Sequence, residues 1–123
     1  MTFEEYETNA LSTAVYPGRG EGFGLMYVAL KMNGEAGEFA EHVGKAMRDD
    51  KFIDYAEYEG WWCNALDPER ESLLIKEIGD VLWYLAAAAK ELGTDLSTIA
   101  RINNEKLAKR KAEGKLGGSG DNR

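Results

Sequence analysis

The chain has 123 residues, which suits one folded domain, because two independent cores would each be too small. Hydrophobic residues make up 44% of it and charged residues 30%, and the formal charge of −7 argues against binding nucleic acid through a basic surface. No apolar run approaches the roughly 20 residues that cross a bilayer, and no charged-then-apolar leader opens the chain. We therefore expect a cytoplasmic protein with no membrane partner and no nucleic-acid partner.

Two helices are predicted in the first half of the chain. Thr2 and Glu5 have the spacing of a capping box, so the first helix begins at Thr2 and ends before the turn-forming stretch 16–20. The second helix runs from about Gly24 to Arg48. Its apolar residues share one arc of the helix surface: Leu25, Ala29, Met32, Ala36, Phe39, Ala40, Val43 and Met47.

Residues 49–66 show no convincing strand alternation and are expected to form an irregular connection. The segment is rich in aromatic residues, namely Phe52, Tyr55, Tyr58, Trp61 and Trp62. A connection this long inside a compact domain is usually a lid, a binding loop or a short extra helix.

Two more helices are predicted in the second half. The third begins at Asp67-Pro68, an N-cap acid followed by proline at the first helical position, and ends near Gly93. Thr94 or Asp95 caps the fourth, which reaches about Glu113. The fold class is therefore all-α, a helical bundle of about four helices over residues 1–114, followed by a Gly-rich tail over 115–123.

Two pairs of acids have helical spacing. Glu35 and Glu38 are three apart on the second helix, and Glu77 and Asp80 are three apart on the third, so each pair projects from one face beside the apolar arc. If the two helices pack side by side, four carboxylates converge and repel one another. Raised pKa values or hard divalent cations could neutralise them, and an all-oxygen ligand set favours Mg²⁺ or Mn²⁺.

The acids alone leave two interpretations open, a metal site and a solvated acidic face. A di-iron centre is disfavoured, because it needs Glu-x-x-His pairs and the only histidine stands in Glu38-x-x-x-His42. His42 itself is more readily a surface residue or a neighbour of the ligands than a ligand. On the fourth helix, Asn103, Lys106 and Arg110 repeat the helical spacing with hydrogen-bond donors in place of acids, as a metal–polyphosphate complex would require. Lys106 and Arg110 could instead compensate the dipole at the C-terminus of that helix.

The chain resembles the all-α MazG-like nucleoside triphosphate pyrophosphohydrolases in four segments. Residues 30–41 resemble that family's Glu-x-x-Glu helix, residues 76–85 its Glu-x-x-Asp helix, and residues 103–110 its Asn-x-x-Lys-Leu-x-x-Arg segment. Residues 117–123 are similar to the Gly-x-Gly-Asp-x-Arg tail of a small, often phage-encoded branch, which would place the protein in the host cytoplasm. The connection over 49–66 is longer than in compact members, so the resemblance says little about it.

The resemblance implies a reaction in which a nucleoside triphosphate and water give the monophosphate and diphosphate, with Mg²⁺ as cofactor and Mn²⁺ able to substitute. By position, the metal ligands would be Glu35, Glu38, Glu77 and Asp80, and the general base Glu38 or Glu41. Groups expected to bind the phosphates are Lys45, Asn103, Lys106, Arg110 and Arg123, with the tail as a candidate to close over them. Trp83 and Tyr84, or Trp61 and Trp62, are candidates to stack on the base, and a purine dNTP is a candidate substrate.

The resemblance also implies an active unit completed by oligomerisation, as a homodimer or homotetramer. Aromatic residues off the main arc, such as Tyr27 and Trp83, are expected to supply apolar surface for it. Two other kinds of protein stay open as alternatives. One is another pyrophosphatase of the same superfamily, either dUTPase-like or a phosphoribosyl-ATP pyrophosphohydrolase. The other is a helical interaction module without catalytic activity.

Overall fold

The structure, a computed structural model, describes residues 1–117. Within them lie α1 (Phe3–Leu11), α2 (Gly24–Asp49), β1 (Ile53–Ala56), β2 (Gly60–Cys63), α3 (Pro68–Glu91) and α4 (Leu96–Ala112). Helices dominate, and the two short strands pair only with each other. The all-α fold class is confirmed.

Local capping chemistry sets where the helices begin. Both halves of the capping box are present at α1, where the Thr2 side chain accepts from the backbone N–H of Glu5 and the Glu5 carboxylate accepts from that of Thr2. At α3, the Asp67 carboxylate accepts from the backbone N–H of Glu69 at 3.0 Å. Asp95 does the same for α4, accepting from Thr98 N–H at 2.7 Å. These contacts satisfy donors that have no partner inside the helix.

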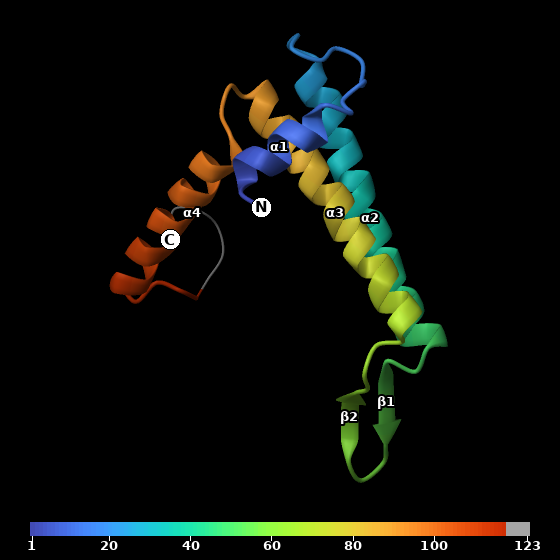
Figure 1. Ribbon diagram of the computed structural model, residues 1–123. Coiled ribbons are helices and arrows are strands. Elements are labelled where there is room, and N and C mark those ends of the chain that lie inside the picture. Colours follow the sequence, from blue (N-terminus) through green and yellow to red (C-terminus); the bar gives the residue numbers. More distant parts are fainter. Residues whose placement is uncertain (118–123) are drawn as a thin grey trace.

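Two long helices, α2 and α3, lie side by side and form the body of the molecule (Figure 1). The short α1 crosses α3 near one end of this pair, and the β-hairpin extends beyond the other end. Helix α4 contacts α1 and α3 and, within the described residues, does not contact α2. Figure 1 shows it diverging from the α2–α3 pair.

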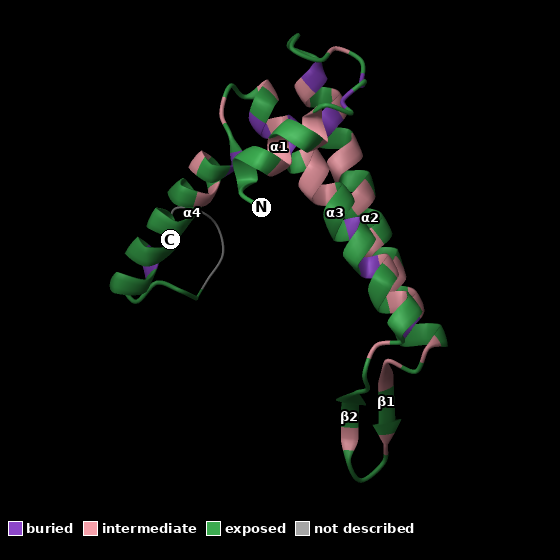
Figure 2. Ribbon diagram, in the orientation of Figure 1, coloured by how far each residue is buried: buried purple, intermediate pink, exposed green. Residues whose placement is uncertain are grey.

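Burial is concentrated where α1 meets the helical pair (Figure 2). One cluster of buried residues holds Ala14, Tyr16, Val28 and Ala87, and a second holds Ala86, Ala89 and Leu96. Tyr27 and Trp83 are half-buried and pack against the first cluster, so part of their apolar surface is used within the chain. Further apolar surface comes from exposed aliphatic side chains on α2, on α3 and at the C-cap of α3: Met26, Leu30, Met47, Ile75, Ile78, Leu85 and Leu92.

The expectation of an irregular connection over 49–66 is wrong for its central part. Strands β1 and β2 pair antiparallel, with Ile53 opposite Cys63 and Ala56 opposite Gly60. Gly60 has a φ of 79°, which a glycine adopts readily at the end of a turn. The aromatic residues of this segment are strand formers, since the rings of Tyr55 and Trp61 meet across the strands with centroids 5.0 Å apart.

No helix among the described residues combines the length and apolar character needed to cross a membrane.

Candidate functional site

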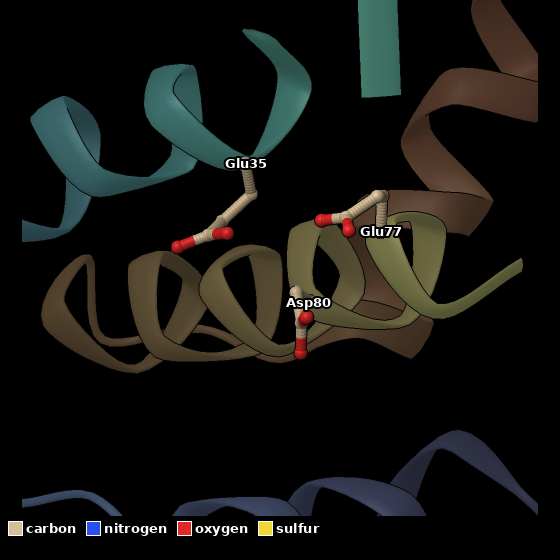
Figure 3. Close-up of side chains that lie close together, drawn as sticks. All are labelled: Glu35, Glu77 and Asp80. Carbon is tan, nitrogen blue, oxygen red and sulfur yellow. The ribbon is translucent and has the colours of Figure 1, made fainter. Parts of the chain in front are cut away.

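Three of the four expected metal-binding acids come together between α2 and α3. Carboxylate oxygens of Glu35, Glu77 and Asp80 all lie within 4.8 Å of one another. Figure 3 shows Glu35 projecting from α2 toward α3, which carries the other two. The i, i+3 spacing of Glu77 and Asp80 puts both on one helix face, and the packing of the two helices brings Glu35 to them.

The fourth acid, Glu38, lies one turn beyond Glu35 on α2, is exposed, and is not among the clustered groups. Glu41 and Lys45 lie farther along the same helix and pair with each other, with the Lys45 ammonium 2.7 Å from a Glu41 carboxylate oxygen. This hydrogen bond lowers the pKa of the Glu41 carboxyl below its ordinary value. The roles expected for these three residues stay predictions.

Each glutamate of the cluster has one neighbouring side chain with a nitrogen close to its carboxylate. The Lys31 ammonium lies 3.3 Å from a Glu35 carboxylate oxygen, one helical turn away, and the pairing raises the pKa of Lys31. His42 Nε2 lies 3.6 Å from Glu77 Oε1. Glu77 is only 9% exposed, so its carboxylate needs a polar partner inside the helix pair.

An open pocket of about 380 Å³ adjoins the acids and is lined by Glu35, Asp80, Trp83 and Tyr84. The indole N–H of Trp83 donates to the backbone oxygen of Ala10 at 3.0 Å, which fixes the ring against α1. The rings of Trp83 and Tyr84 meet edge to face with centroids 4.9 Å apart, and burial raises the pKa of the Tyr84 phenol. The two aromatic residues expected at the site therefore flank two of its acids.

The expected phosphate-binding groups of α4 are not brought to the acids within one chain. Asn103 and Lys106 are exposed and Arg110 is buried, but all three belong to the helix that diverges from the α2–α3 pair (Figure 1). Arg123 lies outside the described residues.

Helix α1 adds a residue that the sequence did not indicate. Burial and the charge of nearby Asp80 raise the pKa of the Tyr6 phenol, so this residue belongs to the surroundings of the acids. Nothing in the local pattern of residues 3–11 could have shown this, because it depends on where α1 docks on α3.

The donor set fits a hard divalent cation. Carboxylate oxygens from two helices lie close enough to share one ion, and the cluster includes neither sulfur nor nitrogen ligands that would favour zinc or copper. Three like charges at this separation destabilise one another, and a divalent cation held by them would offset that repulsion.

Comparison with known proteins agrees with this geometry. The family model described as the MazG nucleotide pyrophosphohydrolase domain matches residues 26–114, a range that includes every clustered acid. The chain is 39% identical over 126 residues to the "Gene 37 protein" of Mycobacterium phage L5, and the similarity covers 100% of both chains. No solved structure matches the chain.

Proposed function

This chain belongs to the MazG nucleotide pyrophosphohydrolase family, and we propose that it is a Mg²⁺-dependent enzyme acting on nucleoside triphosphates. The reaction would be (d)NTP + H₂O giving (d)NMP + diphosphate, by cleavage between the α and β phosphates. The observation that supports it most is the cluster of Glu35, Glu77 and Asp80, which lies inside the family-matched region.

We assign the holding of the cation to these three carboxylates, with Glu38 as a fourth ligand or as the base. When bound, Mg²⁺ would offset charge on the phosphates and lower the pKa of a water molecule. Glu38 is exposed one turn from Glu35, where it could accept the proton of the attacking water. Glu41 is the weaker candidate, because its hydrogen bond with Lys45 makes it less basic.

The pocket beside the acids is the proposed binding site for the nucleobase of the substrate. Trp83 and Tyr84 offer ring surface for a nucleobase there, and a purine dNTP gains more from such contacts than a smaller ring would. Lys45, Asn103, Lys106, Arg110 and Arg123 are the proposed phosphate-binding groups. Because α4 does not contact α2 in one chain, its donors would reach the acids of a second copy in a homodimer or homotetramer.

A substrate panel tests this proposal. Canonical and damaged NTPs and dNTPs are each incubated with the protein and Mg²⁺, and diphosphate is quantified separately from inorganic phosphate. We expect diphosphate from at least one substrate, with Mn²⁺ able to replace Mg²⁺. Diphosphate from dUTP alone or from phosphoribosyl-ATP alone would assign the chain to another branch of the superfamily, and none from any substrate would favour an interaction module.

A further inference from the structure

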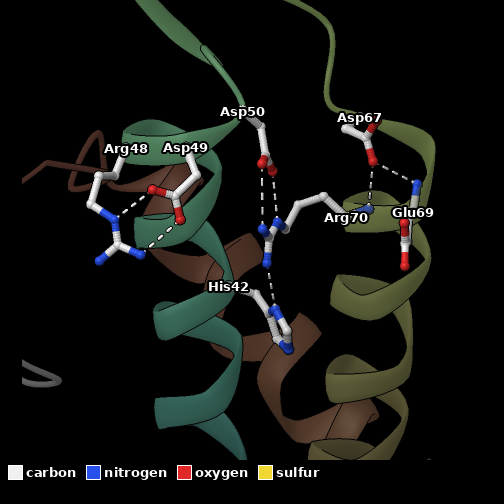
Figure 4. Close-up of polar contacts among 7 residues, drawn as sticks. All are labelled: His42, Arg48, Asp49, Asp50, Asp67, Glu69 and Arg70. Atoms are coloured by element: carbon white, nitrogen blue, oxygen red, sulfur yellow. Dashed lines mark hydrogen bonds and ion pairs between the residues drawn. The ribbon is translucent and has the colours of Figure 1, made fainter.

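The only histidine of the chain lies between a guanidinium and one of the clustered acids. Figure 4 shows its side with the Arg70 guanidinium. Arg70 Nη1 is 3.0 Å from His42 Nδ1, and His42 Nε2 is 3.6 Å from Glu77 Oε1. Asp50 holds the other side of the guanidinium, with Oδ2 2.7 Å from Arg70 Nε and Oδ1 3.4 Å from Nη2. The His42 and Arg70 side chains are only 18% and 15% exposed, so this row of groups is largely shielded from water.

The Arg70 guanidinium determines which nitrogen of His42 carries the proton. Arginine stays protonated in proteins and can only donate, so Nδ1 of His42 must accept. A neutral imidazole with a bare Nδ1 carries its proton on Nε2, the atom that faces Glu77. The two-point contact with Asp50 fixes the plane of the guanidinium and with it this arrangement.

The same geometry excludes His42 as a metal ligand through Nε2. A nitrogen that binds a cation must be unprotonated. If Nε2 were bare, the neutral ring would carry its proton on Nδ1, where it would face the N–H of Arg70. His42 is therefore suited to donate to a ligand and not to act as one.

We propose that His42 is a positioning residue for Glu77. Arg70 and Asp50 hold the imidazole ring so that its Nε2–H orients the Glu77 carboxylate toward the cation. This inference rests on the proposed function, since it assumes that Glu77 binds metal. The separation of 3.6 Å is just beyond a hydrogen bond, so in this proposal the Glu77 carboxylate moves slightly toward His42 when the cation is bound. Carboxylates that bind metals are themselves commonly held by a hydrogen bond from outside the ligand shell.

The arrangement also connects the cation site with the β-hairpin. Asp50 caps the C-terminus of α2, directly before Lys51, whose φ of 54° starts the turn toward β1. Arg70 lies in the first turns of α3, directly after the hairpin. The two ends of the hairpin are therefore joined through the ion pair that fixes His42.

The first test reads the tautomer directly. In ¹⁵N-labelled, tag-free, metal-free protein the single histidine gives one set of ring signals, so a long-range ¹H–¹⁵N spectrum needs no assignment. We expect the proton almost wholly on Nε2 in the wild type and a larger share of it on Nδ1 in Arg70→Ala. A proton on Nδ1 in the wild type would overturn the inference, whatever the protein's activity.

The second test measures metal binding without substrate. Calorimetric titration with Mn²⁺ alone is expected to show that His42→Phe weakens affinity by about 10- to 100-fold, while His42→Gln, which keeps a donor and an acceptor, retains most of it. Helical content by circular dichroism checks that both variants fold. If His42→Phe bound Mn²⁺ as tightly as the wild type while Asp80→Asn bound it more weakly, the role of His42 would be rejected. The proposed metal site would then stand. No Mn²⁺ binding by the wild type would instead reject the proposed function.

Discussion

Asp80 is the clustered acid whose loss separates function from stability most cleanly. It is exposed, whereas Glu77 is 9% exposed and the Glu35 side chain 13%. Replacing Glu77 would leave His42 facing a neutral amide inside the helix pair, which confuses folding with catalysis. Asp80→Asn changes the charge at the site and little else.

Asp80→Asn is expected to lower kcat/KM by at least roughly 100-fold, since loss of groups outside the ligand shell alone costs about 10- to 100-fold. Its melting temperature should stay close to that of the wild type. Glu71→Gln is the matched control, because it makes the same kind of change at an exposed position of α3. Near-normal turnover by Asp80→Asn would remove this residue from the metal site.

Glu91 anchors the loop before α2. Its carboxylate accepts from the Tyr16 hydroxyl at 2.5 Å and from Gly20 N–H at 3.0 Å. The hydrogen bond from Tyr16 and then that from Gly20 lower the pKa of Glu91 below its ordinary 4.5. Because the pKa is lowered on folding, ionised Glu91 stabilises the fold fully above the ordinary value of 4.5. This stabilisation is lost as the pH falls through the lowered pKa.

Glu91→Gln should therefore melt at a lower temperature than the wild type at pH 7. The difference should shrink as the pH falls from 4.5 through the lowered pKa of Glu91, because protonation then removes the charge that distinguishes Glu91 from Gln. Thermal melts of the two proteins across this range measure it. A difference that stayed constant with pH would show that the charge of Glu91 contributes nothing.

At this scale the sequence predicted three acids that come together, but not what surrounds them. Spacing within one helix places Glu77 and Asp80 together, and that information is local. The contacts of Arg70 with Asp50 and His42 join residues 20 and 28 positions apart and depend on how far α3 is shifted along α2. Helical periodicity carries no information about that shift.

At the scale of the elements, the loop that leads into α2 leaves no room for a side chain at Gly24. A Cβ there would lie 2.3 Å from the Gly18 backbone oxygen and 2.9 Å from Glu91 Oε1. Gly18 itself has a φ of 72°, which favours glycine. The loop therefore packs backbone against backbone at the start of the helix.

Gly24→Ala is expected to destabilise the protein by about 1–3 kcal/mol, the usual cost of overpacking a closed site. Gly22→Ala is the control, since a Cβ at Gly22 meets nothing within 4 Å, and its effect should stay within about 0.5 kcal/mol. Urea unfolding of both variants measures the difference. Equal stability of the two would contradict the packing of this loop.

Element boundaries were predictable where a cap defines them and less so elsewhere. Asp67-Pro68 and Asp95 fix the starts of α3 and α4 through their own side chains. The hairpin was missed because its strands are only four residues long and show no clear alternation. Its available signal was two short aromatic runs on either side of a turn that ends in Gly60.

At the scale of the whole molecule, one chain leaves exposed aliphatic side chains on one face of α3 and at its C-cap. Ile75, Ile78, Leu85 and Leu92 follow one another at intervals of three, seven and seven residues, and each is at least 40% exposed. This spacing keeps them on one helix face, the form of a helix–helix interface. A second copy of the chain is the partner that we propose for it.

Ile75→Glu should weaken self-association by about 10- to 100-fold, because burial of one such side chain contributes about 1.5–3 kcal/mol. Lys76→Glu is the control, one position around the same helix and also exposed. Sedimentation velocity over a dilution series gives the dissociation constants. A monomeric wild type would contradict the proposed assembly, and so would an equal effect of both substitutions.

The fold class was predictable from composition and periodicity, whereas the path of α4 was not. Its donors Asn103, Lys106 and Arg110 follow a helical spacing that indicates a shared face, but not the direction of that face. The helix contacts α1 and α3 over a small area, so its position depends on long-range packing and, in our proposal, on a second chain.

We propose that the carboxylates of Glu35, Glu77 and Asp80 hold the cation with which this chain splits a nucleoside triphosphate between its α and β phosphates. The most direct measurement is ³¹P NMR of a dNTP incubated with the protein and Mg²⁺, before and after chelation with EDTA. We predict monophosphate and diphosphate as the only products, no reaction after chelation, and no reaction with Asp80→Asn. Formation of a nucleoside diphosphate with inorganic phosphate would contradict the proposed cleavage position. Undiminished turnover in EDTA would contradict the proposed role of the cation.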